Sequence, residues 1–170
     1  MISPTDLPIL AKEKRVENEA FGRLLRQFPS SLIDPLVQQL YLIVSAEIDC
    51  TACANCCKIP RPAVLVSELT PLANAKGMTL AQFIENHTDS IPFLDEAGNQ
   101  EFIYYLKPKP CPMLKGNLCS VYQERPLSCA DFPHLDKPHF KYRFRQVLEN
   151  YTLCPIVFDV VERLKLHIGQ

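Results

Sequence analysis

Eight cysteines carry most of the reactive chemistry in this 170-residue sequence. Four of them lie close together, in the run Cys50-Thr-Ala-Cys53-Ala-Asn-Cys56-Cys57. Two residues between cysteines let one tight loop present two thiolates to the same metal, and a second such step adds a third. Buried cysteines acting as small apolar side chains explain the run less well, because the surrounding sequence is polar. The run therefore predicts a metal site or a metal cluster.

The other four cysteines are spread along the second half of the chain, at Cys111, Cys119, Cys129 and Cys154. Eight thiols are enough for two four-thiolate sites. Because neighbouring side chains diverge, Cys56 and Cys57 are expected to point in different directions. One arrangement places three thiols of the run in one site and the fourth in a second, and a thiolate that bridges two ions is another. The sequence leaves this partition open.

Thiolate ligands suit both zinc and iron–sulfur clusters. The C-x-x-C steps favour zinc, whereas C-x-x-C-x-x-C with a distant Cys-Pro is similar to a ferredoxin ligand run, and Cys111-Pro112 and Cys154-Pro155 are two such dipeptides. A radical S-adenosylmethionine run is not matched, because Pro60 stands where its third cysteine would fall. The expected cofactor is zinc, in one or more Zn²⁺ sites, or iron in an iron–sulfur cluster.

The local context of the cysteines resembles a known family. After the C-x-x-C-x-x-C-C run come Cys111-Pro-Met-Leu, Gly116-Asn-Leu-Cys119 and the segment from Tyr122 to Pro133, YQERPLSCADFP. These motifs are similar to those of the YkgJ-type cysteine-cluster proteins, which are zinc- or iron-chelating domains, some of them resembling flagellin lysine N-methylase. The resemblance runs from about Cys50 to Pro155. It implies a metal-ligand set of Cys50, Cys53, Cys56, Cys57, Cys111, Cys119, Cys129 and Cys154.

Three residues near the last cysteines bear on this comparison. The family usually has arginine directly after the cysteine matched by Cys129, but this chain has Ala130, so a basic neighbour of the metal is missing. Arg125 is expected either to donate to a thiolate or to make an ordinary turn contact. His134 is a further potential ligand, although eight thiols make it unnecessary.

No catalytic motif accompanies the thiols. The five glycines stand alone and form no dinucleotide, phosphate or S-adenosylmethionine loop, and neither G-x-S-x-G nor H-E-x-x-H occurs. Whether the protein is an enzyme stays open, since lysine N-methylase-like activity follows from the resemblance alone. We expect a metal-binding protein whose eight-thiol site organises the fold. The alternatives are an iron–sulfur redox protein or enzyme related to protein lysine N-methylation, and an adaptor that binds protein or nucleic acid on a zinc-stabilised fold.

The charge and the apolar pattern of the sequence indicate which partners and which cellular compartment to expect. A net charge of -1 provides no broad basic surface for nucleic acid, and the basic and aromatic residues from Phe140 to Phe144 are better explained as a strand with one solvent-exposed face. No apolar run reaches the ~18 residues of a membrane span. The first ten residues do not form a signal peptide, so grouped thiols in a reducing cytoplasm are expected. The expected partners are the metal ion and an unidentified protein, without nucleic acid or membrane.

The elements around the thiols predict a helix-rich α+β single domain with a short antiparallel hairpin and an irregular, proline-rich metal-cluster region. Residues 1–48 are expected to form a helical pair packed on a cysteine-cluster domain, 49–170. In the first helix, an apolar stripe is formed by Val16, Ala20, Leu24 and Phe28 and is widened by Phe21 and Leu25. Asp34-Pro35 is expected to begin the second helix.

The later elements follow from turn and cap signals. A capping box at Thr79 and Gln82 predicts a helix over 80–86, and Gly98 with Asn99 predicts a hairpin of 91–94 and 101–106. Residues 107–138 are rich in proline and cysteine and predict an irregular segment, which metal ligation would have to order. Pro155 predicts the start of a C-terminal helix.

Overall fold

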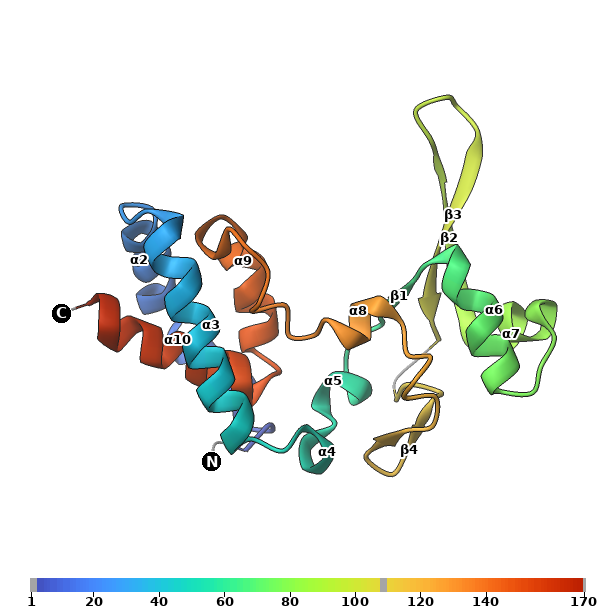
Figure 1. The fold of residues 1–170 in the computed structure, drawn as a ribbon, viewed down its shortest axis with the longest axis horizontal. Coiled ribbons are helices and arrows are strands. Elements are labelled where there is room, and N and C mark those ends of the chain that lie inside the picture. Colours follow the sequence, from blue (N-terminus) through green and yellow to red (C-terminus); the bar gives the residue numbers. More distant parts are fainter. Residues whose placement is uncertain (1–2, 108–109, 170) are drawn as a thin grey trace. The chain divides into compact units, whose positions relative to one another are not determined.

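The computed structural model describes residues 3–107 and 110–169. It is a mixed α+β structure, as predicted, with a small antiparallel sheet among many helices (Figure 1). The chain divides into two compact units, which are described separately below. Unit 1 comprises Met1–Asn55 and Pro133–Gln170, and unit 2 comprises Cys56–Phe132.

Unit 1 is helical. Its elements are α1 (Leu7–Glu13), α2 (Arg15–Leu25), α3 (Ser30–Glu47), α4 (Cys50–Cys53), α9 (Phe140–Tyr151) and α10 (Pro155–Ile168), while α5 (Asn55–Lys58) begins at its last residue. Helices α3, α9 and α10 pack on one another (Figure 1). Ile33 and Val37 of α3, Phe140 of α9 and Leu164 of α10 are completely buried in this core. The start of α10 at Pro155 confirms the predicted C-terminal helix.

The apolar stripe predicted for the first helix is confirmed in part. Phe21 and Leu25 of α2 are buried, whereas Val16 has 66% of its surface exposed. The buried face forms where α2 packs on α9, and the ring of Phe21 meets the ring of Phe144 edge-on with centroids 5.7 Å apart. Several apolar residues of α2 recur at helical spacing, so the position of the neighbouring helix decides which of them are covered.

The predicted strand from Phe140 to Phe144 is wrong, because these residues begin helix α9. Alternation over five residues fits a strand, but the buried side chains of the whole segment are Phe140, Phe144, Val147 and Tyr151. Their spacing of three to four residues is that of a helix with one buried face. The basic side chains lie between them, and Lys141 Nζ donates to the carbonyl oxygen of Phe28 at 2.6 Å.

Asp34 does not begin the second helix, as the sequence had indicated. Helix α3 starts at Ser30, directly after Pro29. The Asp34 carboxylate instead accepts backbone N–H bonds from His139, at 2.8 Å, and Phe140, at 3.0 Å. These donors lie at the start of α9, where the first N–H groups have no partner within the helix. Asp34 therefore caps a helix that follows it by about a hundred residues in the chain.

Replacing Asp34 with alanine is expected to lower the free energy of unfolding of unit 1 by about 0.5–2 kcal/mol, because two N–H groups of α9 lose their acceptor. Chemical denaturation followed by far-ultraviolet circular dichroism measures this change. Asp6→Ala is the matched control, since Asp6 stands before α1 without a side-chain cap bond. Equal losses for the two variants would contradict the capping role.

A carboxylate of α10 joins three donors in unit 1. Glu162 accepts hydrogen bonds from Lys14 and Lys165, each at 2.6 Å, and from the Tyr151 hydroxyl at 2.8 Å. Burial alone would raise the pKa of Glu162, but the bonds from Lys14, Lys165 and Tyr151 outweigh it and hold that pKa below its ordinary value of 4.5. The network therefore stabilises the folded state while Glu162 is ionised.

The stability of unit 1 should fall on acidification. A carboxyl group with a lowered folded-state pKa contributes stability that is present above about pH 4.5 and is lost as the pH falls through the folded-state pKa. Glu162→Gln should remove this part of the pH dependence and leave a flatter curve of melting temperature between about pH 6 and pH 3. An unchanged curve would show that Glu162 is not the group responsible. Glu13→Gln, which alters a carboxylate of α1, is the control.

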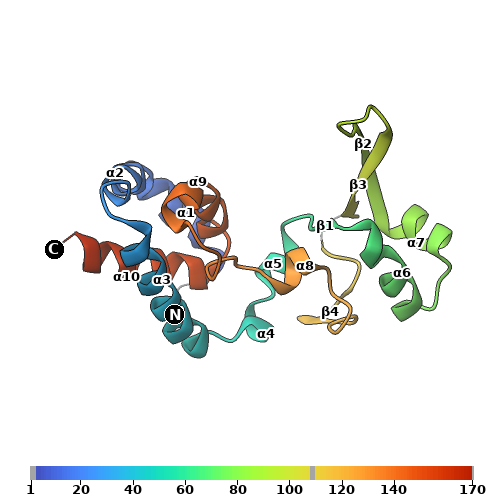
Figure 2. The ribbon, with the colours of Figure 1, turned by 45° about the horizontal axis from the view of Figure 1, so that its top comes forward.

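In its described residues, unit 2 combines a three-stranded sheet, a two-stranded sheet and short helices. Its elements are β1 (Ala63–Val64), α6 (Val66–Ala75), α7 (Leu80–His87), β2 (Thr88–Leu94), β3 (Gln100–Leu106), β4 (Leu114–Lys115), β5 (Leu118–Cys119) and α8 (Leu127–Ala130). The three-stranded sheet, in which β2 and β3 form a long hairpin (Figure 2), has the order β1-β3-β2 and is antiparallel. In its register, Ile91 pairs with Ile103. This confirms the predicted hairpin, and the capping box of Thr79 and Gln82 at α7 is confirmed as well.

The core of unit 2 lies between α6, α7 and the base of the sheet. It contains Val64, Leu69, Leu72, Ala73, Phe83, Leu106, Met113 and Val121. Within 107–138 the described residues form only the short elements β4, β5 and α8, as predicted, while residues 108 and 109 lie outside the described part. Much of this segment is therefore held by contacts other than regular secondary structure.

In the described parts of the chain, no single helix is long and apolar enough to cross a membrane. The bent pair Ser30–Glu47 and Cys50–Lys58 passes the same test of length and composition when the two are taken together.

Candidate metal centre

All eight cysteines lie in the described residues, and none of them is joined in a disulfide bond. Cys154 is buried, Cys50 is exposed and the others are half-buried. The division into units separates them. Unit 1 contains Cys50, Cys53 and Cys154, whereas unit 2 contains Cys56, Cys57, Cys111, Cys119 and Cys129.

In unit 1, a single helical turn presents Cys50 and Cys53. The Asp49 carboxylate starts α4 by accepting from the backbone N–H of Thr51 at 2.8 Å, and the Ala54 N–H donates to the Cys50 carbonyl oxygen at 2.9 Å. Ala54 is buried and left-handed, with φ of 49°, so the chain changes direction directly after Cys53. Asn55 then donates from Nδ2 to the Leu153 carbonyl oxygen at 2.6 Å, which ties this turn to the residue before Cys154.

The three thiols of unit 1 influence one another electrostatically. Burial raises the pKa of Cys154 to about 12, and negative charge on Cys50 or Cys53 also raises this pKa. Hydrogen bonds from the N–H groups of Val157 and Ile156 act in the opposite direction and lower it. Burial also raises the pKa of Tyr41, with contributions from Asp136, Cys50 and Cys154. The Tyr41 hydroxyl is therefore a neighbour of this thiol group, and no motif in the sequence pointed to it.

In unit 2, backbone hydrogen bonds bring Cys57, Cys111 and Cys119 together. The Cys111 N–H donates to the Cys57 carbonyl oxygen at 2.9 Å, which joins residues 54 positions apart. The chain then turns, with the Leu114 N–H donating to the Cys111 carbonyl oxygen at 2.9 Å, and Leu114 pairs with Cys119 in the β4–β5 ladder. The side chains of Cys111 and Cys119 both pack against the core of unit 2.

Helix α8 brings Cys129 to the same region. The Ser128 hydroxyl donates to the Ala63 carbonyl oxygen of β1 at 2.7 Å, and the Leu127 N–H donates to Glu68 at 2.7 Å. Burial raises the pKa of Cys129 to about 12, and negative charge on Cys111, Cys57 and Cys119 raises it further. Cys129 therefore shares its surroundings with the other three thiols.

Cys57 behaves differently from the other thiols of unit 2. A hydrogen bond from the Cys56 thiol lowers the pKa of Cys57 to about 7, against the effect of burial and with help from the charge of Lys58. Burial raises the pKa of Cys111, in contrast. Four half-buried thiols can ionise together only if a cation compensates their negative charge. Burial disfavours each thiolate, and the thiolates repel one another.

The donor set fits a metal that prefers sulfur. Zinc and iron in proteins take thiolate ligands, and metal binding deprotonates the thiols. In the ranges 3–107 and 110–169, no three His, Cys, Asp or Glu side chains converge as a ready-made coordination sphere. The backbone thus gathers the thiols into two neighbourhoods, and the side chains have to close around an ion when it binds.

The residues expected to support the site have other contacts. The Arg125 guanidinium lies over the Tyr122 ring, 3.8 Å from its centroid, and donates to the Tyr122 carbonyl oxygen at 2.8 Å. This is the ordinary turn contact that the sequence allowed. His134 lies in unit 1 in a left-handed conformation, and its carbonyl oxygen accepts from Arg143 at 3.1 Å. Asn55 and Ser128, which tie the cysteine segments to other elements, became visible only in the structure.

The cysteine pattern matches a known protein family. The family model CxxCxxCC, described as "Putative zinc- or iron-chelating domain", matches residues 49–154, which include all eight cysteines. The chain belongs to this family. Membership of the CxxCxxCC family supports the binding of a metal ion, zinc or iron. Searches of the curated proteins and of the solved structures returned no match.

Proposed function

We propose that this CxxCxxCC domain holds metal ions through its cysteine thiols and that the ions have a structural role. The observation that carries the proposal is the gathering of free thiols from distant segments in each unit. The proposed ligands are drawn from the eight thiols, which are Cys50, Cys53, Cys56, Cys57, Cys111, Cys119, Cys129 and Cys154.

A structural role agrees with where the thiols lie. Cys111, Cys119 and Cys129 belong to the part of unit 2 with the least regular structure, and ordering such a segment costs about 1–2 kcal/mol per residue. Structural zinc contributes an apparent free energy of about 10–16 kcal/mol in small domains at neutral pH. Metal binding is therefore strong enough to order this segment. The sequence has no catalytic motif that would favour a catalytic role for the ion over a structural one.

Metal analysis of the purified protein tests the proposal. The protein is produced with both zinc and iron in the medium, purified without oxygen and measured for zinc, iron and acid-labile sulfide. Colourless protein with bound zinc would support a structural zinc domain. Brown protein with iron and sulfide would replace that version with an iron–sulfur protein, the redox alternative. Protein that binds neither metal when reduced and titrated with Zn²⁺ or Fe²⁺ would refute the proposal.

The proposed compartment is the cytoplasm, because the ligands must stay reduced and thiols in reducing compartments do so. Fractionation of cells that express the chain, followed by thiol labelling of each fraction, tests this. Recovery with oxidised cysteines from an oxidising compartment would contradict it.

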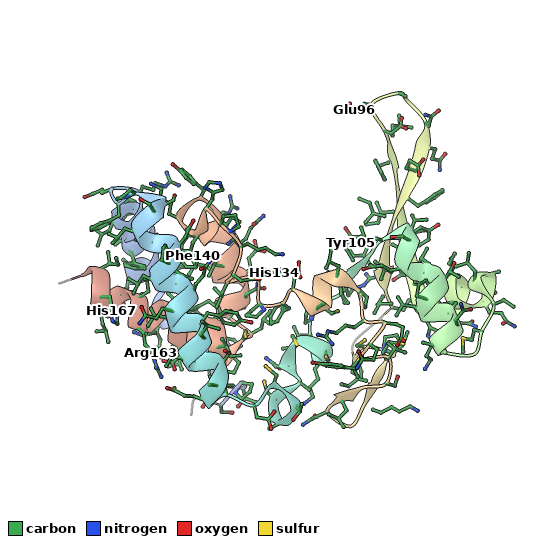
Figure 3. All side chains as sticks on the ribbon, in the orientation of Figure 1. Glu96, Tyr105, His134, Phe140, Arg163 and His167 are labelled. Atoms are coloured by element: carbon green, nitrogen blue, oxygen red, sulfur yellow. The ribbon has the colours of Figure 1, made fainter. Side chains whose placement is uncertain are left out.

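A second candidate function, a protein-binding adaptor, is favoured by the β2–β3 hairpin. Ile91, Phe93 and Leu94 of β2 are 55%, 43% and 70% exposed. The segment 88–106 also contains four carboxylates and no lysine or arginine. Asp89 pairs with Arg61, whereas Glu96 stands at the tip of the hairpin (Figure 3). An exposed apolar surface with acidic neighbours fits a partner segment that is apolar and basic.

A cationic peptide of alternating lysine and leucine tests the adaptor function. Leu94→Ser should weaken its binding, measured by titration calorimetry, whereas Leu166→Ser should not. Leu166 is a matched control, because it is 66% exposed on α10 in the other unit. Equal binding by both variants and the parent chain would exclude the hairpin as a docking surface.

A further inference from the structure

We propose that seven of the thiols form two separate metal sites, one within each unit. Cys57, Cys111, Cys119 and Cys129 share one ion or cluster in unit 2, and Cys50, Cys53 and Cys154 share another in unit 1. This inference rests on the proposed metal-binding function and adds which thiols act together. The linear sequence suggests a different grouping, because it places Cys53 and Cys57 in one compact run.

The contacts of the unit 2 thiols form a continuous chain. Cys57 is joined to Cys111 by a backbone hydrogen bond of 2.9 Å. Cys111 leads through a turn to Leu114, which pairs with Cys119. The Ser120 N–H closes this loop by donating to the Met113 carbonyl oxygen at 2.8 Å. These bonds fix three of the four backbones relative to one another within the unit.

The fourth thiol of this set reaches the same region from α8. Ser128, the neighbour of Cys129, is bonded to Ala63 at 2.7 Å, and β1, which contains Ala63, follows Cys57 after a short connection. Four thiolates are the full ligand set of a structural zinc ion or of one iron–sulfur cluster, so this set needs no further donor.

The contacts of the unit 1 thiols lead elsewhere. Cys50 and Cys53 are the first and last residues of the single turn α4, and the Asn55 bond of 2.6 Å to Leu153 ties the end of that turn to the residue before Cys154. Cys154 is the residue before α10, a helix packed on α3 and α9. Every element in this set belongs to unit 1.

The left-handed backbone of Ala54 gives a local reason why Cys53 and Cys57 belong to different sites. Its left-handed φ of 49° ends α4 and redirects the chain between Cys53 and Cys57. Non-glycine residues adopt this conformation only where the surrounding structure enforces it. The compact cysteine run is therefore divided between two neighbourhoods, and loss of one thiol should empty only the site to which that thiol belongs.

Stoichiometry of zinc-loaded variants tests the partition. The parent chain should bind two equivalents of Zn²⁺. Cys129→Ser and Cys154→Ser should each retain one, and the double variant of these two residues should retain none. The double variant Cys111→Ser with Cys129→Ser lies within one set and should still retain one equivalent. Loss of all zinc in either single variant, or in this last double variant, would overturn the partition.

A labelling experiment on the parent chain keeps the test decisive even if the variants fold poorly. Zinc is withdrawn with a limiting amount of chelator, the released thiols are blocked with N-ethylmaleimide, and intact masses and peptides are analysed. Molecules that have lost one ion should carry labels on Cys57, Cys111, Cys119 and Cys129 together or on Cys50, Cys53 and Cys154 together. Labels mixed from both sets in such molecules would overturn the partition. A parent chain that binds no zinc would instead refute the proposed function, so the two failures are distinguishable.

Discussion

Cys129→Ser is expected to lower both the metal content and the thermal stability of unit 2. Cys129 is a half-buried thiol in the group formed with Cys57, Cys111 and Cys119, and serine is a poor ligand for zinc or iron. Structural metals contribute far more than a single side-chain contact, so we expect a loss of about 3 kcal/mol or more. For a chain of this length this corresponds to a fall in melting temperature of about 6–12 °C. Differential scanning calorimetry and metal analysis of the same sample measure both effects.

Two controls separate metal loss from simple disturbance of α8. Ala130→Ser introduces the same side chain at the next position, which is exposed, and should leave metal content and melting temperature unchanged. Adding a chelator should lower the melting temperature of the parent chain and narrow its difference from Cys129→Ser. If the variant retained its full metal content, or if the difference persisted undiminished without metal, Cys129 would not be a ligand.

The second large effect is expected at Phe83, in the core of unit 2. This side chain of α7 is completely buried among Leu69, Leu72 and Leu106. Phe83→Ala removes most of a buried ring and leaves a cavity, which typically lowers the free energy of unfolding by about 3–5 kcal/mol. Hydrogen exchange of the metal-loaded protein should show faster exchange in α6, α7 and the base of the sheet, because these elements lose a common packing partner.

Phe93→Ala is the matched control, since Phe93 is 43% exposed on β2 of the same unit. It should change the free energy of unfolding by about 0.5 kcal/mol or less. Similar losses at the two positions would mean that α7 does not anchor the core of unit 2. A loss at Phe83 without a change in metal affinity would show that the core and the thiol group of unit 2 are energetically independent.

Elements with a local cause were predictable from the sequence. The helix at Leu80 follows from the reciprocal bonds between Thr79 and Gln82, which are neighbours in the chain. The β2–β3 turn follows from Asp95, whose carboxylate accepts from the N–H groups of Ala97 and Asn99, and from Gly98, which adopts φ of 83°. Pro155 begins α10 because its ring suits the first turn of a helix.

Elements with a distant cause were not predictable in the same way. Asp34 precedes a proline and resembles the start of a helix, yet its carboxylate bonds to α9. The alternation from Phe140 to Phe144 resembles a strand, but packing against α2 and α3 buries one face of a helix. In both cases the partner lies far away in the chain, and a short window of sequence contains no information about it.

The sequence by itself determined the chemistry of this protein. Eight thiols, four of them in a C-x-x-C-x-x-C-C run, are side chains suited to zinc or iron, because ligand chemistry depends on residue type and on short-range spacing. Only the tertiary structure decided which thiols are neighbours. The Cys111 N–H donates to the Cys57 carbonyl oxygen, and the Asn55 side chain donates to the carbonyl oxygen of Leu153, the residue before Cys154, so hydrogen bonds join cysteine segments that are distant in the sequence. Proximity in space depends on those long-range bonds, and spacing along the chain does not encode them.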